Sequence, residues 1–301
     1  WAESSAYDGR WAVAVCSDIS DAPEQYAFMN GAAAVAILVG RDAPLALEGK
    51  RVSHVADEWD FYKPVGWRSM APIFDGPGSK EVYFSALEMC QARYADANGG
   101  MSFVDDHDAL VFHLGGGYKF VWHAFERAMQ ASRGGVGGGE EEEVRRRFEA
   151  LVEPSLRAAV RIGPSHTAAT YVNLWSLLHH APPSLGSRIG VFSFGSGAAC
   201  TMYTLRVRKQ AEIATGELTR ALDARTPLTP RQFAGVCGRY SRSYGRFGYM
   251  PTPRSPPPAQ SYYVQEVTAK GKRVYQYAQY DEIALDVEAE DEFETLEGGE
   301  G

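Results

Sequence analysis

Short apolar runs bounded by glycines or polar turns alternate along the chain with longer segments of helical spacing, and this alternation restricts the fold more than any other feature. Buried strands are predicted at residues 11–15, 31–40, 109–113 and 188–193, an alternating strand at 201–208, and a hairpin around Lys270-Gly271-Lys272 within 261–279. Helices are predicted at residues 79–98, 118–132, from 140 onward, and at 167–180. Strands that alternate with helices define the α/β class.

Composition supports a sizeable core and excludes several classes of protein. Hydrophobic residues make up 45% and aromatic residues 12% of the 301 residues, so wholesale disorder is excluded. No apolar run approaches the roughly 18 residues of a membrane span, and no membrane partner is expected. The four cysteines are scattered and form no CxxC pair, so the sequence predicts neither a disulfide scaffold nor a zinc site. A reducing compartment is the simplest setting for them.

Negative charge is concentrated at the end of the sequence. Residues 281–301 hold ten acidic residues and no Lys or Arg, and removing them from the net charge of −8 leaves the other 280 residues at +2. A nearly neutral body gives little support to a nucleic-acid partner. Residues 281–301 are predicted to be a disordered acidic tail, and residues 133–139 a flexible spacer.

His113 ends an apolar strand and precedes three glycines, a place where α/β proteins often bind ligands. A structural role for this histidine stays open beside a catalytic one. The glycines do not match the GxGxxG dinucleotide pattern, and neither serine of Ser193-Phe194-Gly195-Ser196-Gly197 fits the GxSxG hydrolase pattern. That turn could instead present backbone N–H groups to a ligand oxygen. The acidic cluster 105–108 and the pair His179-His180 predict no metal site.

Several segments together resemble the 3-hydroxy-3-methylglutaryl-CoA (HMG-CoA) synthase family. The most specific is GSRIGVFSFGSGAACTMYTLRV at residues 186–207, and DEWDFYKP at 57–64 is nearly as good. The others are WAESSAYDGRWAVAVCSDI, FDGPGSKEVYFSALEMC, ALVFHLGGGYKFV, LDARTPLTPRQF and SYYVQEVTAKGKRVYQYA. The resemblance covers roughly residues 1–278.

The resemblance implies a thiolase-like αβαβα layered fold built from two related halves. Residues 1–44 would be the end of the N-terminal half, residues 45–280 the C-terminal domain, and 281–301 the tail. It also implies a homodimer that condenses acetyl-CoA with acetoacetyl-CoA in the mevalonate route to isoprenoids and sterols. CoA thioesters are then substrates, and no cofactor or metal is implied. The cytoplasm is the default compartment, and a mitochondrial location stays open.

Seven residues fall on functional positions of the family pattern. His113 matches the catalytic histidine, which positions acetoacetyl-CoA through a carbonyl oxygen. The remaining matches are the CoA-contacting Lys119, the substrate-contacting Ser79 and Ser196, and the residues Asp18, Asp60 and Tyr62 that line the active site.

The sequence also departs from the family pattern. The nucleophilic cysteine and the general acid/base glutamate belong to motifs that precede the position of Trp1, and none of Cys16, Cys90, Cys200 or Cys237 matches the nucleophile. Cys16 is expected to be a packing residue. A family asparagine is replaced by Pro164, and a CoA-side lysine by His123.

Two hypotheses follow from these departures. In one, the chain is a segment of an HMG-CoA synthase that is inactive alone and exposes apolar surface where the rest of the first half would pack. In the other, it is a non-catalytic relative that binds acyl-CoA or pairs with another chain.

Overall fold

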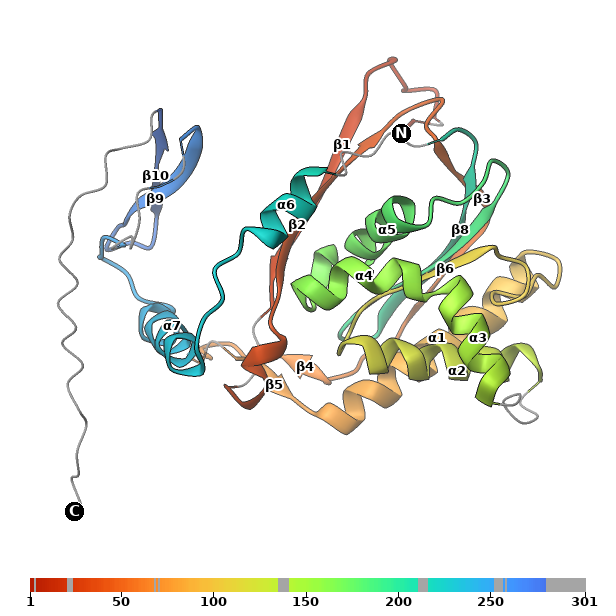
Figure 1. The fold of residues 1–301 in the computed structure, drawn as a ribbon, viewed down its shortest axis with the longest axis horizontal. Helices are drawn as coiled ribbons and strands as arrows, with labels where there is room; N and C mark the ends of the chain where they lie inside the picture. The colour runs from red at the N-terminus through yellow and green to blue at the C-terminus, as the bar shows by residue number, and fades with distance from the viewer. Residues whose placement is uncertain are drawn as a thin grey trace. The chain divides into compact units, whose positions relative to one another are not determined.

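A four-stranded sheet forms the centre of the first structural unit (Figure 1). Its strands lie in the order β3, β8, β7, β6, with β6 parallel to β7 and the other two pairs antiparallel. Their bounds are Leu45–Val55 for β3, Ala109–Phe112 for β6, Arg188–Gly195 for β7 and Ala199–Val207 for β8. The parallel pair ends on one edge of the sheet, so the residues that follow β6 and β7 lie together.

This computed structural model describes residues 1–2, 4–20, 24–67, 69, 71–134, 141–210, 216–251, 257 and 259–279. Residues 135–139 of the predicted spacer and the predicted acidic tail 281–301 lie outside the described residues. The chain divides into two units, Trp1–Cys237 and Gly238–Gly301. The domain boundaries at residues 44 and 280 follow from the family resemblance and stay predictions.

Helices cover both faces of the central sheet because its side chains alternate between two apolar cores. Leu110, Phe112 and Phe192 point to one face, which is covered by α1, α2 and α3. Val111 and Val191 point to the other face, toward α5. The helices are α1 Gly76–Ala97, α2 Tyr118–Ser132, α3 Glu141–Leu151, α4 Glu153–Ile162 and α5 Ala169–His180, with the short 3-10 helix η2 at His166–Ala168.

Gly190 shows how closely the segment before β6 packs on the sheet. A Cβ at this position would lie 2.8 Å from a methyl carbon of Leu110 and 2.9 Å from the ring of Phe103. Both neighbours are buried, so any larger residue would force them apart.

Local sequence fixes where α1 begins and ends. The carboxylate of Asp75 accepts a hydrogen bond from the N–H of Gly78 at 3.1 Å, and Pro77 occupies the first turn. At the other end, the Asn98 side chain both accepts from and donates to the backbone of Lys50 in β3, at 2.8 and 3.0 Å. These contacts hold β3 where its pairing with β8 is interrupted between Glu48 and Val52.

A two-stranded antiparallel sheet forms a further layer beyond α4 and α5 (Figure 1). It consists of β1 Ala12–Ile19 and β2 Ala32–Val39, joined through the 3-10 helix η1 Glu24–Met29. Ala33 and Val35 pack against buried residues of α4 and α5, which makes four successive layers in the order α, β, α, β.

The other face of β1–β2 is exposed, so the prediction that both strands are buried is wrong on this side. Val13, Val15 and Leu38 are 61%, 65% and 57% exposed. Val13 lies opposite Leu38 in the antiparallel register, so these side chains share one apolar face.

Smaller elements complete the description. In the first unit, β4 Phe61–Tyr62 pairs with β5 Ile73–Phe74, and α6 spans Gly216–Asp223. Helix α7, Pro230–Ser243, contains the boundary between the units. In the second unit, β9 Ser261–Val267 and β10 Arg273–Ala278 form the predicted hairpin.

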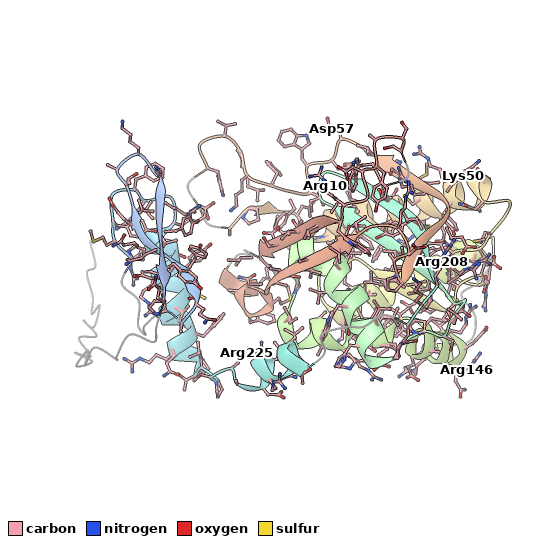
Figure 2. The ribbon with its side chains drawn as sticks, turned by 90° about the horizontal axis from the view of Figure 1, so that it is seen from above. Arg10, Lys50, Asp57, Arg146, Arg208 and Arg225 are labelled. Atoms are coloured by element: carbon pink, nitrogen blue, oxygen red, sulfur yellow. The ribbon has the colours of Figure 1, made fainter. Side chains whose placement is uncertain are left out.

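Charged side chains are spread over the surface of the first unit. Lys50, Arg146 and Arg208 are exposed and come from separate parts of the fold, namely β3, α3 and the segment after β8 (Figure 2). Among the described residues, no helix combines the length and hydropathy needed to cross a membrane.

Candidate active site

A cavity of about 770 Å³ lies at the carboxyl ends of β6 and β7, bounded also by β1, β3, β8 and η2. Its described lining combines polar, aromatic and thiol groups. These residues are Cys16, Asp18, Ile19, Ser53, Val55, Phe61, Lys63, Pro72, His113, His166, Thr167, Tyr171, Ser193, Phe194, Gly195, Ser196, Ala199, Cys200 and Thr201. The two sheets together therefore bring the predicted Asp18, His113 and Ser196, far apart in sequence, to one cavity.

His113 follows β6 directly and is fixed by its own backbone. Its N–H donates to the carbonyl of Phe192 at 2.8 Å, and its carbonyl accepts from the hydroxyl of Tyr83 at 2.9 Å. The ring contacts the hydroxyl of Thr170 through Nδ1 at 3.2 Å. Burial, followed by the nearby imidazole of His166, lowers the pKa of His113 to about 4. The ring is therefore neutral at pH 7.

Asp18 joins β1 to the start of η2. Its carboxylate accepts hydrogen bonds from the Thr167 hydroxyl at 2.7 Å and from the Ile19 N–H at 2.9 Å. Burial acts to raise the pKa of Asp18, but these hydrogen bonds and the charge of His166 outweigh it and lower the pKa below 3.8. Asp18 thus places a carboxylate on the cavity wall near His113.

Asp60 anchors the glycine turn that carries Ser196. Its carboxylate is buried and accepts from the Gly197 N–H at 2.9 Å, while its backbone carbonyl accepts from the Ser79 hydroxyl at 3.0 Å. Neither Asp60 nor Ser79 lines the cavity: Asp60 holds the β7–β8 turn that carries Ser196, and Ser79 bonds Asp60 from the start of α1. Ser196 itself is exposed to the cavity.

Two further predicted residues, Lys119 and Tyr62, are not brought to the cavity either. Lys119 is exposed on the first turn of α2 and is not part of its lining. Tyr62 packs edge to face on Trp59 with ring centroids 4.9 Å apart, while its neighbours Phe61 and Lys63 line the cavity. Alternation along an extended segment explains this, because Phe61 and Lys63 share the side opposite to Tyr62.

The positions that depart from the family pattern also lie elsewhere. Pro164 is buried and lines a second cavity of about 420 Å³, together with Asn30, Leu114 and Tyr118. His123 is exposed on α2 and contacts the carboxylate of Glu126 at 2.8 Å.

His166 is a lining residue that sequence reasoning missed. It has a positive φ of 42°, an uncommon backbone conformation for a non-glycine residue, and its ring lies 5.5 Å from that of Phe61. Cys16 and Cys200 also line the cavity, which contradicts the expectation that Cys16 only fills the core. The signal for Cys16 was its even spacing from Asp18 on the same strand, which places both side chains on one face.

Comparison with known proteins agrees with the fold. The family model for the hydroxymethylglutaryl-coenzyme A synthase C terminal matches residues 45–131 and 141–278. The structure of MvaS in complex with HMG-CoA superposes with a TM-score of 0.72 at 25% identity, over 90% of this chain and 68% of that one. The curacin pathway HMG synthase reaches 0.76 at 20% identity, a likeness of fold alone. The fold is therefore thiolase-like.

Relatives of known sequence identify the family. The chain is 32% identical to the hydroxymethylglutaryl-CoA synthase erg13A of Aspergillus fumigatus, over 83% of this chain and 63% of the relative. It is 32% identical to the human mitochondrial enzyme, over 83% of this chain and 59% of the relative. The chain belongs to the hydroxymethylglutaryl-CoA synthase family, and it spans about 60% of the length of these relatives.

Proposed function

We propose that the cavity beside His113 binds the acetoacetyl group of acetoacetyl-CoA, in the reaction that condenses it with acetyl-CoA to HMG-CoA. The observation that carries this proposal is His113 itself, a neutral imidazole at the end of β6 in a cavity whose walls also hold Asp18 and Ser196. Family membership supports the choice of substrate. CoA thioesters are the substrates in this proposal, and no cofactor takes part.

His113 donates a hydrogen bond to a carbonyl oxygen of the substrate. A neutral imidazole donates from only one nitrogen. The proposal requires the tautomer whose proton is on Nε2, in which Nδ1 accepts a hydrogen bond from the Thr170 hydroxyl 3.2 Å away. Donation to a carbonyl polarises it and stabilises the negative charge that develops on its oxygen when a carbanion adds. The Thr170 hydroxyl thus holds the Nδ1 side of the ring, and it also contacts the Ser193 hydroxyl.

No residue of this chain matches the nucleophilic cysteine or the general acid/base glutamate that the family uses for acyl transfer. Cys16 and Cys200 line the cavity, but both lie on sheet strands at positions that do not correspond to the family nucleophile. We expect this chain alone to bind acetoacetyl-CoA and not to become acetylated, because covalent catalysis needs its specific nucleophile. Pro164 in place of the family asparagine favours the alternative of a non-catalytic acyl-CoA-binding relative, because proline has no side-chain amide to donate.

Calorimetric titration of the 301-residue chain with acetoacetyl-CoA tests the proposed site. His113→Ala should weaken binding roughly three- to tenfold, because one hydrogen bond contributes about 0.5–1.5 kcal/mol. His180→Ala, which removes an exposed histidine at the end of α5 outside the cavity lining, is the matched control and should bind as the original chain does.

Two outcomes would contradict the proposal. One is equal affinity of the original chain and His113→Ala while both remain folded. The other is no binding of acetoacetyl-CoA by the original chain. Incubation with radiolabelled acetyl-CoA should leave the protein unlabelled, and stable label on any of the four cysteines would refute the expected lack of acetylation.

Pairing of two chains is the remaining part of the proposal. The exposed apolar face of β1–β2 is a surface against which a second copy of the chain can pack. This agrees with the homodimer that the resemblance implies. The cytoplasm stays the predicted compartment, with the mitochondrion as the alternative.

A further inference from the structure

Two cysteines that are 110 residues apart in sequence lie side by side in the core. The Sγ atoms of Cys90 in α1 and Cys200 in β8 are 3.3 Å apart. Both residues are free thiols, 0% and 4% exposed. A disulfide needs its sulfurs at about 2.05 Å, so a relative movement of little more than 1 Å would bring them to bonding distance.

The two thiols differ in access and in acidity. Cys200 lines the cavity, whereas Cys90 lies behind it in the core between α1 and the sheet. The hydrogen bond between the two thiols, with a contribution from Arg93, lowers the pKa of Cys200, and the same hydrogen bond raises the pKa of Cys90. When the pair loses one proton, Cys200 is therefore the thiolate, and it is the thiol that a small molecule in the cavity meets first.

We propose that Cys90 and Cys200 form a reversible disulfide when a peroxide enters the cavity. The Cys200 thiolate attacks one peroxide oxygen, the O–O bond breaks, and Cys200 becomes a sulfenic acid while hydroxide leaves. The Cys90 sulfur then attacks Cys200, the S–O bond breaks, and water leaves. In total the two thiols lose two electrons and two protons, and hydrogen peroxide is reduced to two molecules of water.

The disulfide would fasten the wall of the cavity to α1. Cys200 lies between Ala199 and Thr201, which also line the cavity, and α1, which carries Cys90, packs on β3 and β8 behind this wall. Oxidation thus links the cavity wall to α1 through a covalent bond. This inference does not depend on the proposed function, because its test measures thiols and not CoA binding.

Oxidation of the 301-residue chain with hydrogen peroxide, followed by trypsin digestion without reductant, tests the inference. We expect residues 81–93 and 189–206 to appear as one cross-linked peptide, lighter by two hydrogen atoms than the sum of the two. Dithiothreitol should separate them. The double variant Cys16→Ser, Cys237→Ser is the matched control and should form the same cross-link, because both removed thiols are outside the pair.

The variants Cys90→Ser and Cys200→Ser separate the two chemical steps. Cys90→Ser should leave a sulfenic acid on Cys200 that dimedone captures, and Cys200→Ser should leave Cys90 unmodified. The inference is overturned if peroxide oxidises Cys16 or Cys237 while Cys90 and Cys200 of the original chain stay reduced. It is also overturned if Cys90 is oxidised equally well in folded Cys200→Ser.

Discussion

The ring of His113 links the chemistry of the cavity to the stability of the fold. Its pKa falls from 6.5 to about 4 because burial, and then His166, disfavour the charged ring. The unfolded chain therefore binds a proton at a higher pH than the folded chain does. The resulting contribution to the free energy of unfolding is present above pH 6.5 and is lost as the pH falls toward 4.

His113→Asn should remove this dependence. Between pH 7 and pH 4 the original chain should lose more stability than His113→Asn, by up to about 3 kcal/mol at about 1.4 kcal/mol per pKa unit. Urea unfolding at both pH values measures the difference, and His123→Asn is the control on an exposed ring. If the original chain and His113→Asn lose the same free energy of unfolding between pH 7 and pH 4, the ring titrates normally and the prediction is wrong.

Individual site residues could be predicted only where a strand end fixes them. His113 follows an apolar run that ends at a sheet edge, so its place in the site was predictable from the sequence. The side chains of Phe61, Tyr62 and Lys63 could not be assigned to a face, because the strand there is two residues long and has no alternation to follow. The positive φ of His166 depends on the contacts around η2, and no local signal in the sequence indicates it.

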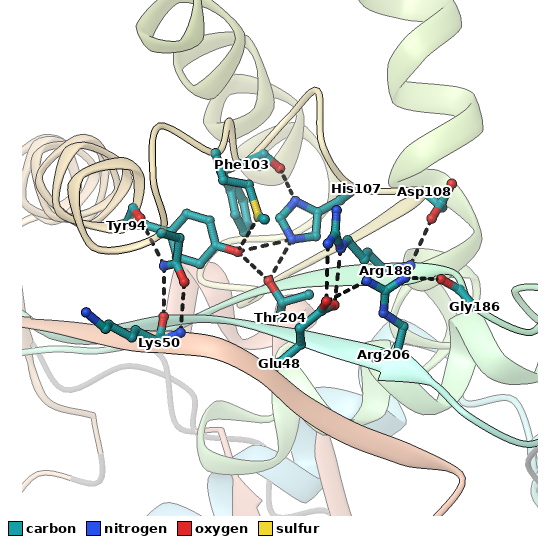
Figure 3. A network of polar contacts seen from close by, with 12 residues as sticks. Glu48, Lys50, Tyr94, Phe103, His107, Asp108, Gly186, Arg188, Thr204 and Arg206 are labelled. Atoms are coloured by element: carbon teal, nitrogen blue, oxygen red, sulfur yellow. Dashed lines mark hydrogen bonds and ion pairs between the residues drawn. The ribbon is translucent and has the colours of Figure 1, made fainter.

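Among the elements, β3 is held to the rest of the sheet by a network of polar side chains (Figure 3). Glu48 of β3 bonds Arg188 of β7 at 3.1 Å and also contacts Arg206 of β8. Hydrogen bonds from these two guanidinium groups lower the pKa of Glu48 to about 2. Beside them, the buried His107 bonds the Thr204 hydroxyl at 2.8 Å and the Phe103 carbonyl at 2.9 Å, which ties β8 to the segment before β6.

Glu48→Gln should destabilise the chain at neutral pH by about 1–2 kcal/mol, since charged hydrogen bonds are lost at a partly exposed site. The contribution of Glu48 is present above its ordinary pKa of 4.5 and lost as the pH falls toward 2. The melting temperatures of the original chain and the variant should therefore converge between pH 5 and pH 2.5. A gap that stays constant over this range would contradict the prediction.

Elements with an uninterrupted pattern were predicted well, and elements with an interrupted pattern were missed. The predicted helix at 118–132 matches α2, which begins after a glycine with a positive φ at Gly117. The strand β3 was not predicted, because Glu48-Gly49-Lys50-Arg51 breaks its apolar alternation where its pairing with β8 is irregular. Asn98 holds the strand together there, and that contact depends on the tertiary fold.

For the molecule as a whole, the exposed face of β1–β2 is the main departure from an ordinary monomer surface. We expect the 301-residue chain to self-associate, because burying this face removes apolar area from water. Val13→Lys together with Val15→Lys should shift the chain toward monomer in gel filtration with little change in melting temperature, since both side chains are already more than half exposed. Leu185→Lys is the control, because Leu185 is a loop residue that is also more than half exposed. It should change neither the association state nor the melting temperature. A monomeric original chain would contradict this expectation.

The two sheets also differ in how firmly their backbones are held. β7 is paired on both sides, whereas β1 and β2 pair only with each other among the described strands. Two-stranded sheets open more easily than larger ones, so amide hydrogens of β1 should exchange with solvent sooner than those of β7. Yet β1 supplies Cys16, Asp18 and Ile19 to the cavity. A molecule bound there would slow exchange along the whole hairpin, and anything that loosens the hairpin would weaken binding by the same free energy.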